Sequence, residues 1–156
     1  MGIKDAFLNK GWAGRTIDRR ATIERLNPLI RMHHELNHAY NHAINRVSDA
    51  ETAGRLEAFQ RIARADIGKL SESVLSAGGV AYNGLDLETG GDDGDDEKTI
   101  IRRLRDSEEA FQRRLKDELG ENHQIRSRAI LAVVLGNSSD RLEYLGDITK
   151  TRTRSR

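Results

Sequence analysis

Apolar residues recur every three or four positions through four stretches of the chain, which is the spacing of amphipathic α-helices. Glycines and capping residues separate these stretches, and clusters of β-branched or aromatic residues typical of strands are few. Asn27 and Pro28 are typical of an N-cap and a first helical residue. The pattern predicts an all-α fold with helices over 27–47, 48–77, 96–119 and 122–149, and residues 22–26 are an alternative backward extension of the first helix.

The segment between the second and third predicted helices, 78–96, is longer than the roughly 2 to 8 residues that usually join bundle helices. Fully extended, it reaches about 60 Å, whereas a helix of this size is about 36 Å long. It can therefore cross the whole bundle and let the second and third helices run parallel. This predicts a four-helix bundle with a long crossover between helices 2 and 3, the ferritin-like variant.

Two flanking segments are not expected to join the core. Residues 1–21 carry apolar side chains spread over about half a helix circumference, and we interpret them as an N-terminal extension that docks on the bundle or on another subunit. The last seven residues, KTRTRSR, carry four positive charges and nothing apolar, which predicts a disordered basic tail over 150–156. The bundle domain is assigned to 22–149.

Three stretches of the chain carry a resemblance to a known family: LNPLIRMHHELNHAYNHAIN, LEAFQRIARADIGKLSESVLSAGGVAYNG and LRDSEEAFQRRLKDEL. Together they resemble bacterial ferritin-like four-helix proteins of uncharacterised function, over roughly residues 22–149. The resemblance implies the bundle fold. Di-iron members of this group take a glutamate from each of two helices and a Glu-x-x-His from each of the other two. This chain has one such string, at Glu35 to His38, so we do not expect ferroxidase activity or iron storage.

Charge and cysteine content exclude several other classes. The net charge is +1 and there is no cysteine, so thiolate metal sites, disulfides and cysteine nucleophiles are ruled out, and we expect a cytoplasmic location. No apolar run approaches the roughly 18 residues of a membrane span. The basic tail lacks interleaved aromatic residues, so specific nucleic-acid binding is not expected.

Four of the five histidines lie between positions 33 and 42. His34, His38 and His42 fall on the side of the first helix opposite its apolar face. The string His34-Glu35-Leu36-Asn37-His38 matches His-Glu-x-x-His, in which two imidazoles one turn apart bind zinc and the glutamate acts as general base. The stripe is a candidate metal site with Glu35 as its catalytic residue. The competing interpretation is a solvated or helix-contact face.

A second group of polar residues faces the predicted core: His33, Asp66 and Glu108. A buried carboxylate needs a partner, because an unpaired buried charge is costly. One histidine and two carboxylates could hold one zinc, iron or manganese ion. The alternative is a structural hydrogen-bond network, for which Arg64 or a water could serve as partner, and Ser138 is the inward polar residue of the last helix.

The sequence therefore supports two functions. The preferred one is a noncatalytic helical protein that forms a homo-oligomer or binds a partner protein, its polar core fixing helix register. The alternative is a protein holding one transition ion, where Glu35 could activate a metal-bound water. No serine-hydrolase or nucleotide-binding motif is present, so metal-free catalysis is not indicated.

Overall fold

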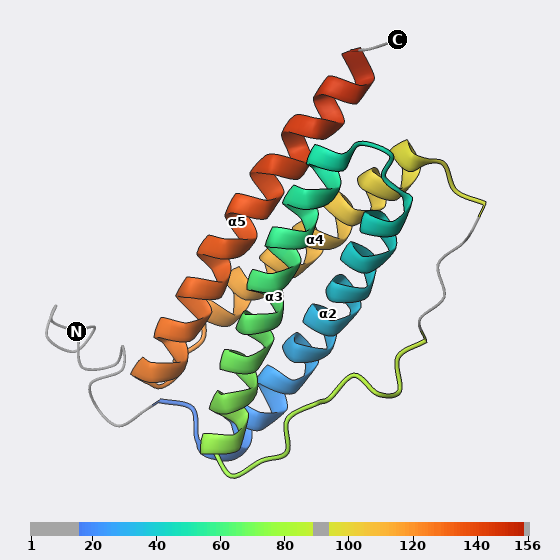
Figure 1. Ribbon diagram of the computed structural model, residues 1–156. Coiled ribbons are helices and arrows are strands. Elements are labelled where there is room, and N and C mark those ends of the chain that lie inside the picture. The colour runs from blue at the N-terminus through green and yellow to red at the C-terminus, as the bar shows by residue number, and fades with distance from the viewer. Residues whose placement is uncertain (1–15, 89–93, 155–156) are drawn as a thin grey trace, which may run out of the picture.

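Four α-helices form a bundle in the computed structural model, which describes residues 16–88 and 94–154 (Figure 1). No strand occurs in this part of the chain, which confirms the predicted all-α four-helix bundle. The predicted N-terminal extension falls mostly on residues 1–15, outside the described residues. The helices are α2 (Arg19–Arg46), α3 (Ala50–Ser76), α4 (Glu97–Leu119) and α5 (Ile125–Arg154).

The first helix begins eight residues before Asn27, and three residues before the alternative extension over 22–26. Asp18 is its N-cap, and its carboxylate accepts a hydrogen bond from the Ala21 amide at 2.7 Å. Pro28 lies inside the helix rather than at its start. The side chain of Asn27 instead donates to the carbonyl of Val80 at 3.0 Å and accepts from the amide of Tyr82 at 2.9 Å. The predicted start at Asn27 was therefore wrong, because its side chain forms hydrogen bonds with the segment after α3 and does not cap its own helix.

Each helix packs against two others: α2 and α5 both contact α3 and α4. The amide of Ser48, in the α2–α3 turn, donates to the Glu97 carboxylate at 2.7 Å, which places the start of α4 beside the end of α2. At the other end, Arg25 of α2 donates to Glu118 of α4 at 2.6 Å. The two helices are therefore antiparallel. The C-terminus of α3 and the N-terminus of α4 lie at opposite ends of the bundle (Figure 1).

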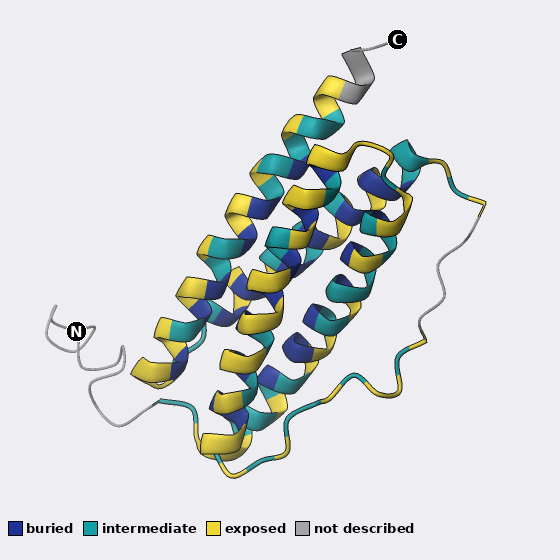
Figure 2. Cartoon of the chain, in the orientation of Figure 1, coloured by how far each residue is buried: buried dark blue, intermediate teal, exposed yellow. Residues whose placement is uncertain are grey.

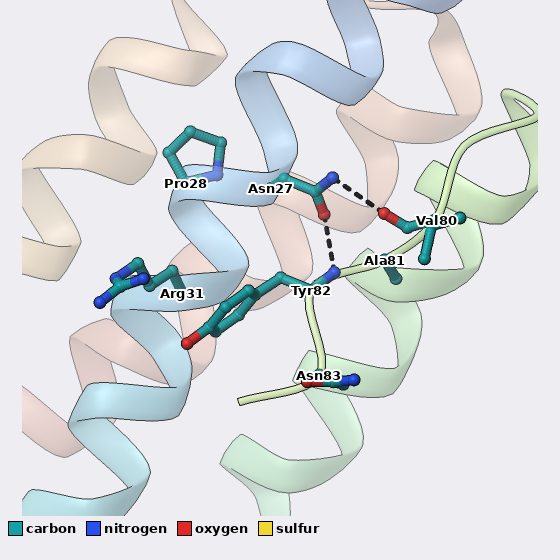
Figure 3. A pocket seen from close by; sticks show the side chains of 7 residues that line it. All are labelled: Asn27, Pro28, Arg31, Val80, Ala81, Tyr82 and Asn83. Atoms are coloured by element: carbon teal, nitrogen blue, oxygen red, sulfur yellow. Dashed lines mark hydrogen bonds between the residues drawn. The ribbon is translucent and has the colours of Figure 1, made fainter. Parts of the chain in front are cut away.

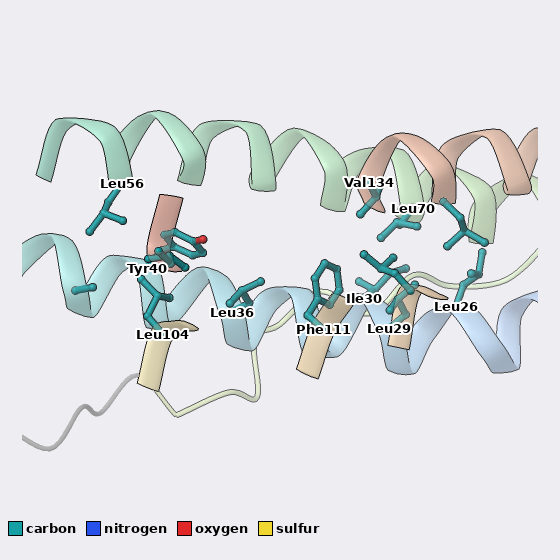
Figure 4. Packing of buried hydrophobic residues seen from close by; sticks show 14 of the residues in the cluster. Leu26, Leu29, Ile30, Leu36, Tyr40, Leu56, Leu70, Leu104, Phe111 and Val134 are labelled. Carbon is teal, nitrogen blue, oxygen red and sulfur yellow. The ribbon is translucent and has the colours of Figure 1, made fainter. Parts of the chain in front are cut away.

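Apolar side chains from all four helices fill the centre of the bundle, and exposed residues lie on its outside (Figures 2 and 4). One charged side chain, Arg141, is the largest of the fully buried residues. Removing each large apolar side chain from water contributes about 1.5–3 kcal/mol. The core is therefore conventional except for a polar layer that runs through it. The apolar part of the core includes Leu26, Leu29, Ile30, Leu36, Tyr40, Leu56, Leu70, Leu104, Phe111 and Val134.

The last helix continues past the predicted end of the bundle domain. Residues 150–154 belong to α5, where we expected a disordered tail. The hydroxyl of Thr151 donates to the carbonyl of Asp147 at 3.0 Å within this last part of the helix. Positive charge such as that of Lys150 is favourable near the negative end of a helix dipole, which explains why the basic stretch extends the helix. Among the described residues, no helix combines the length and apolar character needed to cross a membrane.

Candidate functional site

The polar layer centres on Glu108, a fully buried carboxylate of α4. Its Oε2 accepts a hydrogen bond from the Tyr40 hydroxyl at 2.7 Å, and its Oε1 accepts one from the Ser138 hydroxyl at 2.7 Å. The Nε of Arg141 donates to both oxygens at 3.0–3.1 Å. The carboxylate is thus bound by groups from α2 and α5, and it satisfies the requirement that a buried charge be paired.

Arg141 joins Glu108 to the second buried carboxylate, Asp66 of α3. Its Nη2 lies 3.0 Å from Glu108, and its Nη1 lies 4.0 Å from Asp66. Asn137 completes the link by donating to both oxygens of Asp66 at 2.9 and 3.1 Å, and Lys69 approaches it at 3.5 Å. The cluster connects all four helices, because Tyr40 lies on α2 and the other members lie on α3, α4 and α5. We call these residues, Tyr40, Asp66, Glu108, Asn137, Ser138 and Arg141, the buried ion-pair cluster.

The protonation of the cluster follows from its burial and its charges. Burial lowers the pKa of Arg141, but the adjacent Glu108 carboxylate outweighs this effect and raises it above the usual value. Burial and then Glu108 raise the pKa of Tyr40 well above its usual value. Arg141 therefore stays charged, and Tyr40 stays a protonated hydrogen-bond donor.

His33 is buried, as predicted, but it has a different role from Asp66 and Glu108. Its ring stacks on Phe111, with centroids 4.4 Å apart and planes at 30°. Neither ring nitrogen has a hydrogen-bond partner among the described residues. Burial above all, and then the charges of Arg141 and His34, lower the pKa of His33 to about 3. His33 is therefore a neutral aromatic core residue.

The three predicted interior ligands do not form a cation-binding group. Arg141 lies between the two carboxylates, and His33 packs against an aromatic ring. No set of three or more His, Asp or Glu side chains in the described ranges converges as metal ligands would. The partner that the carboxylates need is thus an arginine of α5, which sequence reasoning missed. Arg141 could have been found, since it lies one turn after Ser138 on the inner face of that helix.

The histidine stripe is less exposed than predicted, because segment 82–84 covers part of it. The His34 ring lies edge-on to Tyr82, with centroids 5.7 Å apart. A Cβ atom added to Gly84 would lie 2.8 Å from Nδ1 of His34, so the backbone is in close contact with the imidazole. Burial, and next the neighbouring His38, lower the pKa of His34.

The predicted catalytic residue of the stripe already has a partner. Glu35 accepts a hydrogen bond from Arg31 of the same helix at 3.3 Å, in an exposed ion pair. His38 and His42 are half-buried. The stripe does not form part of a three-ligand group within the described residues. As a metal site, His34 and His38 therefore need further ligands from outside the described residues.

A groove of about 500 Å³ lies between α2 and the segment that follows α3 (Figure 3). The guanidinium of Arg31 lies 5.4 Å from the centroid of the Tyr82 ring, and it also pairs with Asp86 at 3.5 Å. The Tyr82 hydroxyl donates to the same Asp86 carboxylate. These contacts attach the segment to α2. The groove is lined by Asn27, Pro28, Arg31, Val80, Ala81, Tyr82 and Asn83.

A third buried carboxylate, Glu118 at the C-terminal end of α4, was not predicted from the sequence. It is fully buried and accepts from Arg25 at 2.6 Å, and Nε2 of buried His123 lies 2.7 Å away. Arg114 lies 3.7 Å from its second oxygen. Three basic side chains therefore surround one carboxylate, which joins the ends of α2 and α4 to the turn before α5.

Comparison with known proteins does not assign the chain. No protein-family model matches the sequence, and no curated protein matches it. The established result is the architecture, an all-α four-helix bundle that is compatible with a ferritin-like fold. The resemblance to bacterial ferritin-like proteins stays a prediction.

Proposed function

We propose that this protein is a noncatalytic helical bundle that acts through self-association or through binding of a partner protein. The observation that carries the proposal is the closed arrangement around Glu108. Tyr40, Ser138 and Arg141 occupy its oxygens, so the carboxylate is already neutralised by the protein. A catalytic carboxylate needs access to a substrate, whereas this one is fully buried.

We further propose that the bundle is ferritin-like, with a long crossover between α3 and α4. The support is the antiparallel pairing of α2 with α4, seen in the contacts of Ser48 with Glu97 and of Arg25 with Glu118. An up-down bundle would place α3 and α4 side by side with a short turn. A fold of this kind hosts many activities, so the topology alone assigns none.

The buried ion-pair cluster is proposed to fix the register of the four helices. Apolar side chains can slide past one another at little cost, whereas a displaced Glu108 or Arg141 would be an unpaired charge in the core. A fixed register would give the bundle one defined outer surface. Such a surface is what a binding or self-associating protein requires.

The experiment that tests the proposal is light scattering on the untagged full chain over a wide concentration range, combined with elemental analysis of protein purified without chelator. We expect a mass above the 17.5 kDa of one chain and no stoichiometric metal. A strictly monomeric protein that recovers no partner from a lysate would contradict the proposal. Stoichiometric Zn, Fe or Mn retained through dialysis would favour the alternative below.

One observation favours metal binding as a second candidate function. His34 and His38 lie one turn apart on α2, and the pKa of His34 is lowered by burial and by the nearby His38, so the two imidazoles could bind one transition ion with ligands from another molecule. This candidate predicts that zinc retention is lost when His34→Ala is combined with His38→Ala. Unchanged stoichiometric binding in this double variant would eliminate the stripe as a metal site.

A further inference from the structure

A small polar pocket lies at the end of the bundle where α2 and α5 begin and α3 ends (Figure 1). Its volume is about 100 Å³, well below the roughly 300–1,000 Å³ of pockets that bind drug-sized molecules. It therefore has room for one small group and not for a nucleoside. We call it the end pocket. Guanidinium and hydroxyl groups are prominent in its lining, from Arg19, Arg126, Ser73, Ser76 and Ser127.

Ser127 of α5 provides the observation that points to a ligand. The residue is only 8 % exposed, yet its hydroxyl makes no hydrogen bond to any of the described residues. Buried hydroxyls are nearly always paired, because leaving water without gaining a partner costs free energy. Ser73 of α3 is equally buried, and its hydroxyl has only a long contact of 3.5 Å with the carbonyl of Lys69. Two buried hydroxyls of the end pocket are therefore available to a small ligand.

The side chains of the end pocket carry a net positive charge. Arg19 makes no ion pair in the part of the chain that the structure describes, whereas the adjacent Arg20 pairs with Glu24 at 2.9 Å. Arg126 forms an ion pair at 3.0 Å with Glu72, which also lines the pocket. Both partners of that pair are exposed, and exposed pairs are weak, so an incoming anion can share Arg126. Arg19 and Arg126 against Glu72 leave a charge of +1.

The backbone around the end pocket also favours an anion. The first backbone hydrogen bond of α5 runs from the Arg128 amide to the Gln124 carbonyl at 2.9 Å. The amides of Arg126 and Ser127 precede this bond, so they have no acceptor inside the helix. Such amides, together with the helix dipole, attract oxyanions to a helix N-terminus. The C-terminus of α3 opposes this little, because the amides of residues 77–79 already donate to its last carbonyls.

We infer that the end pocket binds one tetrahedral oxyanion, the phosphate group of inorganic phosphate or of a small phosphate monoester. Arg19 supplies the unpaired charge, and the hydroxyls of Ser73 and Ser127 donate to the phosphate oxygens. A metal cation is disfavoured by the positive charge of the pocket, and an apolar group would leave the buried hydroxyls unpaired. The site lies within one chain, so it goes beyond the proposed function and does not depend on self-association.

The test is urea denaturation of the untagged full chain in sodium phosphate and in sodium chloride of the same ionic strength, with calorimetric titration of inorganic phosphate. We expect a saturable rise in the denaturation midpoint with phosphate only, because a ligand that binds the folded chain alone stabilises it. Glycerol 3-phosphate, tested in the same way, distinguishes the two sources of the phosphate group. Saturable binding of either compound supports the site, and binding of neither beyond the effect of chloride overturns it.

Two neighbouring arginines give a matched pair of variants for the same titration. Arg19→Gln and Arg20→Gln remove the same charge, but only Arg19 lines the end pocket. We expect Arg19→Gln to raise the Kd for phosphate about 10-fold or more and Arg20→Gln to leave it nearly unchanged. Ser127→Ala should weaken phosphate binding without destabilising the phosphate-free protein, because its hydroxyl has no described partner to lose. Equal weakening by the two arginine variants, or unchanged binding in Arg19→Gln and Ser127→Ala, overturns the inference.

Discussion

Arg141 carries a charge that is fully buried in the core of the bundle. A guanidinium in a protein core loses its hydration, and several kcal/mol per ion must be recovered from paired charges and hydrogen bonds. Here Glu108 lies 3.0 Å away and Asp66 4.0 Å away, both fully buried. The gain over an apolar core is small, because pairing mainly offsets desolvation. The large cost appears when one partner is removed.

This cost predicts the behaviour of Glu108→Gln. The substitution keeps the shape of the side chain but leaves the buried Arg141 charge without its closest counter-ion. We expect the free energy of unfolding to fall by about 3–5 kcal/mol, measured by urea denaturation. The matched control is Ser138→Ala, which removes one donor to the same carboxylate and should cost about 1.5–3 kcal/mol. A smaller loss in Glu108→Gln than in Ser138→Ala would contradict the ion-pair interpretation.

Burial of His33 makes the free energy of unfolding depend on pH, and its contribution decreases as the pH falls. Its pKa falls from 6.5 to about 3 on folding, so between these pH values the unfolded chain holds a proton that the folded chain excludes. The contribution of His33 to stability is therefore complete above the unfolded pKa and is lost as the pH falls below it. From pH 7 to pH 4 the loss amounts to roughly 3 kcal/mol.

Urea denaturation of the wild type and His33→Leu at both pH values measures this contribution. The carboxylates that also titrate in this range are common to both proteins, so their effect cancels in the difference. We expect the wild type to lose roughly 3 kcal/mol more than the variant between pH 7 and pH 4. Equal losses of stability in the two proteins would show that His33 is protonated at pH 4 in the folded state as well.

The sequence identified the inward carboxylates but not their partner. Periodicity placed His33, Asp66 and Glu108 toward the core, and all three are fully buried. Arg141 was missed because an arginine is rarely assigned to a core face, and the apolar stretch 129–136 blurs which side of α5 faces inward. A metal was a reasonable expectation for two buried carboxylates until a buried cation was found between them.

At the scale of elements, segment 79–88 explains why the start of α2 was misread. Asn followed by Pro is a common helix start. The side-chain amide of Asn27, however, forms hydrogen bonds with the backbone of the segment packed beside it. The actual cap, Asp18, precedes a stretch of arginines with little apolar periodicity. The start of α4 was predicted closely because Asp96 caps its own helix, accepting from the Thr99 amide at 2.7 Å.

The fit of this segment against α2 predicts opposite effects for two glycine substitutions. Gly84 has a φ of +76°, and a Cβ there would lie 2.8 Å from the His34 ring. Gly84→Ala is expected to lower the free energy of unfolding by about 1–3 kcal/mol. Gly68, inside α3 with nothing within 4 Å of a Cβ, is the control, and Gly68→Ala is expected to raise it by about 0.5–1 kcal/mol. Thermal denaturation of both variants checks the pair, and a stabilising Gly84→Ala would contradict the close contact.

At the scale of the whole molecule, the connection between α3 and α4 decides which helices can be neighbours. Because α4 begins beside the α2–α3 turn, the chain leaving α3 must travel to the other end of the bundle. The 23 residues of α4 correspond to about 34 Å. The crossover that we propose needs a connection long enough to cover this distance, which a short turn could not do.

Shortening the connection tests the topology directly. Replacing residues 80–95 with a four-residue glycine–serine turn leaves eight residues between α3 and α4, which reach at most about 29 Å. We expect this variant to keep helical circular dichroism but to lose the sharp thermal transition, because α4 and α5 can no longer pack in their places.

The matched control replaces the same residues with sixteen glycines and serines. It retains the reach but removes the contacts of Val80 and Tyr82 with Asn27. This variant should unfold cooperatively at a lower temperature than the wild type. A cooperative transition in the four-residue variant, at the temperature of the wild type, would show that α3 and α4 meet at one end. The pair of variants therefore separates the length of the connection, which sets the topology, from its side chains, which attach it to α2.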